Sequence, residues 1–168
     1  MRVKNVVLIG FMGTGKSTVG KVLAGRLGWQ FVDTDQKVEE RQGMTISEMF
    51  ATLGESAFRQ TESETLDSVL EQSSQVISTG GGAILAERNR LSMKKDGYVI
   101  ALKAAAETII ERVKHDQSRP LVQGDVEERV HKLLESRRNA YDFADLIIDT
   151  TGVSVEEIVE QIIASTLD

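Results

Sequence analysis

Residues 6–17, VVLIGFMGTGKS, hold the most informative pattern in the chain. Residues 6–9 form a continuous apolar run, which is typical of a strand buried on both faces of a sheet. Residues 10–17 satisfy the pattern G-x-x-x-x-G-K-S/T, and apolar residues then recur at helical spacing over residues 16–27, which Gly28 closes. Glycines let the backbone aim its N–H groups at phosphate oxygens, and a helix N-terminus favours negative charge. The stretch therefore predicts a phosphate-binding loop between a buried strand and a helix.

The side chains of this loop indicate how a nucleotide would be held. We expect Lys16 to reach the β- and γ-phosphates and the Ser17 hydroxyl to bind Mg²⁺. The residues of the loop predicted to bind nucleotide are Gly13, Thr14, Gly15, Lys16, Ser17 and Thr18. The loop predicts a nucleotide but does not identify the second substrate.

Short apolar runs alternate with helical patterns along the rest of the chain. Further strands are predicted at residues 31–32, 75–78, 98–102 and 146–148. Helices are predicted at residues 16–27, 55–70, 104–114, 126–138 and about 154–167, with a capping box at residues 45–48. Residues 115–125 are polar, hold the only proline and predict a loop. Five strands separated by helices predict an α/β fold, with a five-stranded parallel sheet flanked by helices on both faces.

Composition limits the class of protein. The chain has 168 residues, of which 40% are hydrophobic, so we expect one compact domain over residues 1–168. Lysine and arginine number 20 and aspartate and glutamate number 26, which gives a formal net charge of 20 − 26 = −6. An acidic balance disfavours nucleic acid and anionic membrane surfaces as partners. An anionic ligand must therefore meet a few focused cations.

Cysteine and histidine usage excludes several kinds of site. The chain has no cysteine, which rules out disulfides, thiolate zinc sites and cysteine nucleophiles. The two histidines, His115 and His131, are too far apart in the sequence to suggest a metal site. No apolar stretch approaches the roughly 20 residues of a transmembrane helix. We expect a cytoplasmic domain in a reducing compartment, without a membrane partner.

A set of further motifs, in a fixed order, carries a family resemblance. They are Asp33-Thr34-Asp35, Phe58-Arg59 with Glu62, Gly80-Gly81-Gly82, Arg119-Pro120-Leu121, and Arg137 followed by Tyr141. Together with the phosphate loop, this set resembles the shikimate kinase family of small P-loop kinases, over about residues 6–149. The resemblance implies ATP and shikimate as substrates, Mg²⁺ as the cofactor and a monomer. It also implies a mobile lid at about residues 115–125 and an acceptor-binding region at about residues 33–62.

The resemblance assigns roles to the aspartates. It places Asp33 in the Mg²⁺ shell and Asp35 on the hydroxyls of the acceptor, where Asp35 either accepts a proton or orients the attacking hydroxyl. Both follow a predicted strand, and open α/β sheets bind ligands at the carboxyl ends of their strands. Asp149 also ends a strand and is the alternative metal carboxylate. A pair of ordinary turn aspartates is the structural alternative.

The resemblance assigns roles to the cations as well. Arg59 and Arg137 are expected to clamp the carboxylate of the acceptor, since two guanidinium groups fix a small acid in one orientation. Arg138 competes with Arg137 for this role on sequence grounds alone. Glu62 falls three residues after Arg59 on one helix face, where it either holds Arg59 or forms an ordinary surface pair.

Three further expectations concern the glycine triplet, the lid and the adenine. Gly80, Gly81 and Gly82 are expected to let the backbone approach the acceptor closely. Arg119 is the expected catalytic lid arginine, which also contacts the nucleotide phosphates. Arg112 is expected to pack on the adenine, and residues 151–154 to border it.

Three alternatives remain open at the level of sequence. Another small-molecule kinase, such as a gluconate or nucleotide kinase, would share the loop, and a sugar acid would also use the arginines. A GTPase-type switch would share the loop, but the guanine-reading pattern N-K-x-D is absent from the chain. A kinase-like binding module without activity is the third alternative, although every proposed catalytic position is filled.

Overall fold

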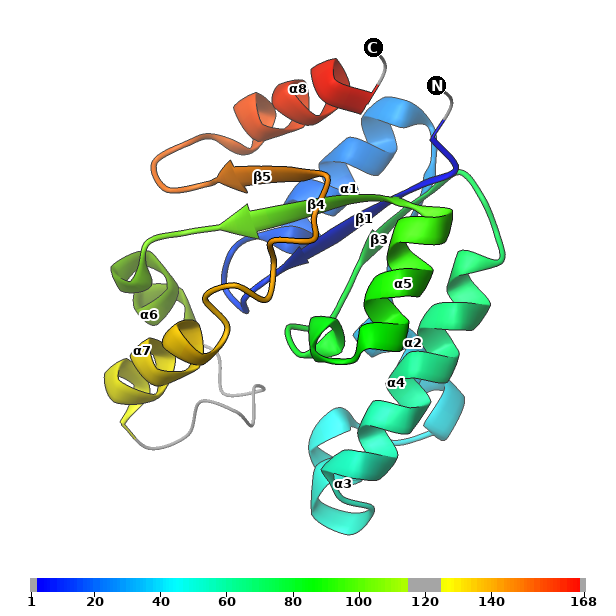
Figure 1. Ribbon diagram of the computed structural model, residues 1–168, viewed down its shortest axis with the longest axis vertical. Helices are drawn as coiled ribbons and strands as arrows, with labels where there is room; N and C mark the ends of the chain where they lie inside the picture. Colours follow the sequence, from blue (N-terminus) through cyan, green and yellow to red (C-terminus); the bar gives the residue numbers. More distant parts are fainter. Residues whose placement is uncertain (1–2, 115–124, 167–168) are drawn as a thin grey trace.

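The computed structural model describes residues 3–114 and 125–166. Its centre is a five-stranded sheet with the strand order β2-β3-β1-β4-β5, in which every neighbouring pair is parallel (Figure 1). The strands are β1 (Asn5–Gly10), β2 (Gln30–Asp33), β3 (Gln75–Ser78), β4 (Tyr98–Lys103) and β5 (Leu146–Asp149). Because all five strands run in one direction, their carboxyl ends lie along one edge of the sheet, and loops at this edge can form a site.

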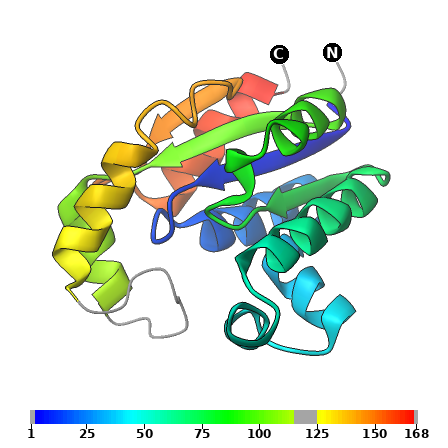
Figure 2. The ribbon, with the colours of Figure 1, turned by 60° about the horizontal axis from the view of Figure 1, so that its bottom comes forward.

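The central strand β1 shows why helices cover both faces. Successive side chains of a strand point to opposite faces, so an apolar run needs apolar partners on each side. Val6 and Leu8 pack in one buried cluster, with residues of α1 (Lys16–Leu27) and α8 (Val155–Thr166). Val7 and Ile9 pack in another, with residues of α4 (Glu55–Leu70) and α5 (Glu87–Asp96). Figures 1 and 2 show these helix pairs on the two sides of the sheet.

The remaining helices form two groups, which lie at the lower left and lower right of Figure 1. One group holds α2 and α3, and the other holds α6 and α7. Their bounds, with that of the short 3₁₀ helix η1, are α2 (Thr34–Gln42), α3 (Ile46–Thr52), η1 (Ala83–Leu85), α6 (Ala106–Lys114) and α7 (Val126–Ser136). Each group packs in a small apolar cluster. The first surrounds Met49 and includes Phe58 of α4, and the second surrounds Val130 and includes Phe11 and Met12 of the phosphate loop.

The predicted fold class is confirmed, and several local predictions hold in detail. Gly28 closes α1 in the left-handed conformation, with φ +66°. The Thr45 side chain accepts a hydrogen bond from the Glu48 N–H at 3.1 Å and caps α3. The helix predicted at residues 126–138 is shorter, because α7 ends at Ser136 and Arg137 is its C-cap.

The sequence analysis missed α2 and α5. Both helices are polar almost throughout and bury few side chains, Val38 being the only buried apolar residue of α2 and Met93 that of α5. The apolar periodicity that reveals α1 and α4 is therefore absent from them. The expected lid at residues 115–125 lies outside the described residues, except for Asp125, which caps α7. Within the described ranges, no helix is both long and apolar enough to cross a membrane.

Candidate active site

The phosphate loop joins β1 to α1 at the carboxyl edge of the sheet. Gly10, Gly13 and Gly15 have φ values of +149°, +77° and +95°, a region that residues with a side chain rarely adopt. A Cβ atom at Gly10 would also meet the carbonyl oxygen of Leu102 on β4. The glycines of the motif are therefore needed both for backbone conformation and for the fit of the loop against the neighbouring strand.

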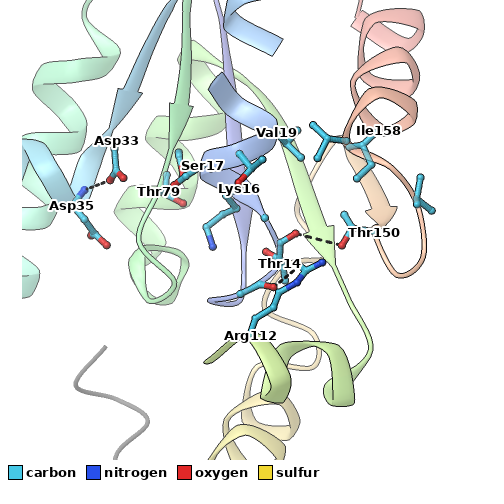
Figure 3. A pocket seen from close by; sticks show the side chains of 16 residues that line it. Thr14, Lys16, Ser17, Val19, Asp33, Asp35, Thr79, Arg112, Thr150 and Ile158 are labelled. Carbon is cyan, nitrogen blue, oxygen red and sulfur yellow. Dashed lines mark hydrogen bonds between the residues drawn. The ribbon is translucent and has the colours of Figure 1, made fainter. Parts of the chain in front are cut away.

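Lys16 lies inside this loop and is 8% exposed. Its Nζ donates to the carbonyl oxygens of Gly10 at 2.8 Å and of Phe11 at 3.1 Å. The Thr14 hydroxyl donates to the same Phe11 carbonyl at 2.8 Å, and Thr150, after β5, donates to the Thr14 carbonyl at 3.3 Å. Hydrogen bonds within the loop, and one from Thr150 after β5, thus fix the loop backbone. The Lys16 ammonium lies against that backbone, beside the other loop side chains (Figure 3).

A cavity of about 410 Å³ opens over the loop. Arg112 of α6 borders it, and its Nη1 donates to the Gly13 carbonyl at 2.6 Å. The predicted nucleotide residues that line it are Gly13, Thr14, Gly15, Lys16, Ser17, Thr18 and Arg112. The wall opposite Asp33 and Asp35 is apolar and comes from the segment after β5 (Figure 3). Residues 151–154 are expected to border the adenine, and of these Val153 lines the cavity. Val155 and Ile158 also line it and were not predicted from the sequence.

A second cavity, of about 420 Å³, lies beside the first. Its polar lining includes Arg59, Glu62 and the glycine triplet, and its apolar lining consists of Met12, Ile46, Phe50 and Phe58. Asp33 and Asp35 line both cavities. The two spaces therefore meet at a pair of carboxylates, which the sequence analysis predicted for the metal and the acceptor.

Asp33 ends β2 and caps α2. Its Oδ1 accepts hydrogen bonds from the N–H groups of Asp35 at 2.9 Å and Gln36 at 3.3 Å. These bonds satisfy N–H groups that would otherwise lack a partner at the helix start. The capping turn also sets the direction of Asp35, which stands in the first turn of α2. Asp33 is therefore a turn aspartate, as the structural alternative predicted, and it also lines both cavities.

The three glycines after β3 each leave room for one charged side chain. An added Cβ atom would lie 2.5 Å from Asp35 Oδ1 at Gly80, and 3.6 Å from Arg137 Nη1 at Gly81. At Gly82 it would lie 2.5 Å from Arg59 Nη1. None of the three has a positive φ, so Gly80 and Gly82 are required for space, whereas a Cβ at Gly81 would make only an ordinary contact. The triplet gathers Asp35, Arg59 and Arg137 around one short stretch of backbone.

Arg59 and Glu62 form an ion pair at the wall of the second cavity. Arg59 Nη1 donates to Glu62 Oε1 at 3.0 Å, and Arg59 Nη2 lies 3.5 Å from Glu55 Oε1. Glu62 is 2% exposed, and its Oε2 has no hydrogen-bond partner within the described residues. Burial raises the pKa of Glu62 to about 6, against the opposing effect of Arg59. Glu62 is therefore a buried partner of Arg59, and the surface-pair alternative does not hold.

The structure separates Arg137 from Arg138. Arg137 is 5% exposed, and its Nη1 donates to the Gly81 carbonyl at 3.3 Å. The Arg138 side chain is 71% exposed and pairs with Glu135. Arg137 contacts the glycine triplet but does not line the second cavity. It instead borders a smaller cavity of about 190 Å³ behind the phosphate loop.

Comparison with known proteins decides the family. The family model for shikimate kinase matches residues 12–167. Shikimate kinase from Thermodesulfovibrio yellowstonii is 48% identical over 161 residues, which cover 95% of this chain and 93% of that protein. The chain belongs to the shikimate kinase family. It is therefore an ATP-dependent kinase of shikimate.

Solved structures agree with membership of the shikimate kinase family. Shikimate kinase from Acinetobacter baumannii in complex with shikimate has a TM-score of 0.94 and 35% identity, and the match covers 98% of this chain and 93% of that one. A gluconokinase from Sinorhizobium meliloti has a TM-score of 0.60 at 16% identity, so it shares the fold alone. The gluconate-kinase and GTPase alternatives are therefore set aside in favour of the shikimate kinase family.

Of the described residues predicted for the site, Arg137 and Asp149 line neither of the two large cavities. Asp149, the alternative metal carboxylate, is exposed and accepts a hydrogen bond from the Thr151 N–H, which lowers its pKa. Arg119 lies outside the described residues. Met12, Ile46 and Phe50 are apolar residues of the second cavity to which the sequence assigned no individual role, although Ile46 and Phe50 fall within the acceptor-binding region predicted at about residues 33–62.

The residues predicted to hold the metal of a shikimate kinase fit a hard cation. The described residues contain no group of three or more acidic or histidine side chains around one point. Mg²⁺ bound with a nucleotide does not need such a group, because it uses one or two carboxylates, water and phosphate oxygens. Ser17 and Asp33 line one cavity, and the described hydrogen bonds to the Asp33 carboxylate both use Oδ1, so this pair of oxygen donors fits a hard cation.

Proposed function

We propose that the γ-phosphoryl group of ATP passes to the 3-hydroxyl of shikimate where the two cavities meet, beside Asp33 and Asp35. The observation that supports this is the lining that the cavities share, since both carboxylates border the two spaces. Phosphoryl transfer requires the attacking oxygen, the phosphorus and the leaving oxygen to lie roughly in line. Two cavities that share these two carboxylates suit such a transfer between two separately bound molecules.

The nucleotide is proposed to occupy the cavity over the phosphate loop. Backbone N–H groups of residues 13–18 and the Lys16 ammonium would bind the phosphates, and Arg112 would flank the adenine. Ser17 and Asp33 would hold Mg²⁺, which neutralises phosphate charge as it is transferred. Arg119 is proposed to contact the phosphates as well, and this role rests only on the resemblance to shikimate kinases.

Shikimate is proposed to occupy the second cavity. Asp35 would accept hydrogen bonds from its hydroxyls and orient the attacking one, because it stands where the cavities join. Arg59 and Arg137 would bind its carboxylate, and the glycine triplet between them sets their separation. The rings of Phe50 and Phe58, with centroids 5.0 Å apart, offer an apolar wall for the carbon ring of shikimate.

The direct test is an ADP-release assay on the purified chain with ATP and Mg²⁺. We expect ADP release to depend on shikimate and to be absent with gluconate, with a nucleoside monophosphate or without an acceptor. Release of ADP at the same rate without shikimate would contradict the assignment.

A substitution at the junction of the cavities tests the proposed place of transfer. Asp35→Asn removes the charge that orients the hydroxyl, and we expect kcat to fall by roughly 100-fold or more. Asp149→Asn is the matched control, since it makes the same chemical change at a strand end outside both cavities. Equal effects of the two substitutions, or an unchanged kcat in Asp35→Asn, would place the chemistry elsewhere.

We propose further that the chain is a monomer in the cytoplasm, and that residues 1–168 form one domain. The support is a shared core that joins the two ends of the chain, since α1 and α8 pack in one cluster. Light scattering after size exclusion should give the chain mass of 18.5 kDa. Twice that mass would contradict the monomer, and recovery in a membrane fraction would contradict the localisation.

A further inference from the structure

Arg137 is held by groups that do not line the acceptor cavity. Its guanidinium carbon lies 5.6 Å from the centre of the Phe11 ring. Phe11 is 2% exposed and packs with Ile109 and Val130 between the phosphate loop and helices α6 and α7. A cation over an aromatic face is attracted to it, most strongly where water is excluded. One face of Arg137 is therefore fixed by a residue of the phosphate loop.

Tyr141 borders the same small cavity as Arg137 but belongs to a different core. It is 5% exposed, packs in the cluster around Val7 and Ile9, and borders the small cavity together with Arg137 and Phe11. Its hydroxyl makes no hydrogen bond of ordinary geometry within the described residues. Burial raises the pKa of Tyr141, and the nearby Arg137 charge opposes that rise, so the two groups interact electrostatically. A buried hydroxyl thus lies at the same small cavity as this cation.

We infer that Phe11 and the Tyr141 hydroxyl are positioning residues that direct the Arg137 guanidinium across the glycine triplet toward the carboxylate of shikimate. Arg137 donates to the Gly81 carbonyl without lining the acceptor cavity, so the direction of its side chain decides whether it reaches that cavity. The inference rests on the proposed role of Arg137 in binding that carboxylate. Neither Phe11 nor Tyr141 lines the acceptor cavity, so each would act through Arg137 alone.

Phe11 also contacts a cation of each proposed substrate site. Its carbonyl oxygen accepts the hydrogen bond from Lys16 Nζ, while its ring lies against Arg137. The residue thus joins the cation of the phosphate site to the cation of the acceptor site through one rigid loop. A substitution that changes only the ring should therefore weaken the binding of shikimate, while the backbone hydrogen bond with Lys16 remains.

The test compares the KM for shikimate with the KM for ATP in conservative variants. Phe11→Leu keeps an apolar side chain without the aromatic face, and we expect the KM for shikimate to rise roughly three- to tenfold. Tyr141→Phe keeps the ring without the hydroxyl and should raise the KM for shikimate roughly two- to fivefold. In both variants kcat and the KM for ATP should stay within about twofold. Tyr98→Phe, at the opposite end of the sheet, is the matched control and should change nothing.

A double-mutant cycle separates this inference from the proposed function. If Arg137 carries the effect, Phe11→Leu should add nothing to the KM for shikimate in an Arg137→Ala background. Three outcomes would overturn the positioning role. They are an equal rise in the KM for shikimate in both backgrounds, a parallel rise in the KM for ATP, and an unchanged KM for shikimate in both single variants. An Arg137→Ala variant with an unchanged KM for shikimate would instead overturn the proposed clamp.

Discussion

At the residue scale, Glu62 shows burial and charge acting against each other. The ion pair with Arg59 favours the carboxylate, but the loss of water around a side chain that is 2% exposed outweighs it, so the pKa rises to about 6. A surface glutamate at the same helical spacing would keep an ordinary pKa. Helical spacing in the sequence predicts the pair, and burial decides its electrostatic character.

The raised pKa of Glu62 predicts a pH-dependent contribution to stability. Between the ordinary glutamate pKa of 4.5 and the raised value of about 6, the folded protein keeps a proton that the unfolded chain releases. The stabilisation is therefore complete below the unfolded pKa and is lost as the pH rises through about 6. Relative to Glu62→Gln, the wild type should lose about 2 kcal/mol of unfolding free energy between roughly pH 4.5 and pH 7. Urea unfolding of both proteins measures this, and a constant difference between them would refute the raised pKa.

At the element scale, glycines mark where segments approach each other. Gly20 of α1 faces β2, where an added Cβ would lie 2.6 Å from Phe31 Cε2 and 3.3 Å from Leu8 Cδ1. Gly25, in the same helix, has no atom within 4 Å of such a Cβ. The first glycine thus sets how closely α1 packs on the sheet, and the second has no packing role.

Alanine at these two positions should have opposite effects on stability. Gly25→Ala should raise the unfolding free energy by about 0.5–1 kcal/mol, because alanine favours the helix. Gly20→Ala gains the same helix preference but forces the ring of Phe31 to move, so we expect a net loss of about 1–2 kcal/mol. Thermal and urea unfolding check both, and stabilisation by Gly20→Ala would show that the contact relaxes without cost.

The connection from β3 to η1 allows a matched test of the glycine triplet. A Cβ at Gly82 would collide with the flexible end of Arg59, whereas one at Gly81 would make an ordinary contact with Arg137. Gly82→Ala should therefore leave the fold intact and raise the KM for shikimate roughly tenfold by displacing the guanidinium. Gly81→Ala should change that KM by less than about twofold. Steady-state kinetics measure both, and equal KM values would refute the spatial role of Gly82.

At the scale of the whole molecule, the net charge and the site charges differ in sign. The chain carries a net charge of −6, yet Lys16, Arg59, Arg112 and Arg137 gather at the carboxyl edge of the sheet. Long-range attraction of polyanions is therefore weak, while small anions meet several cations at one place. The molecule should discriminate between anions by size.

Ligand-dependent stability tests this discrimination. A ligand at about 100 times its Kd should stabilise the native state by about 2.7 kcal/mol, which corresponds to a rise in Tm of roughly 5–10 °C for a chain of this size. We expect this rise with shikimate and with a non-hydrolysable ATP analogue, and none with duplex DNA at low salt. A comparable rise with DNA would show that the acidic surface does not exclude polyanions.

Much of the fold could be predicted from local patterns. The run at residues 6–9 and the motif after it specify β1, the loop and α1, because a buried strand, positive-φ glycines and helical spacing are local properties. The polar helices α2 and α5 could not be predicted in this way, because tertiary contacts rather than an apolar face stabilise them.

The candidate site likewise combines features that the sequence predicts and features that only tertiary contacts decide. The phosphate loop, the parallel fold and the residue types that meet two anionic substrates follow from the amino-acid sequence, since these depend on neighbours in the chain. Three features required the folded chain: Asp33 and Asp35 border both cavities, Arg137 rather than Arg138 meets the glycine triplet, and Glu62 is buried. Burial and charge contacts depend on segments far apart in the sequence, and these segments meet only when the sheet brings its carboxyl ends together.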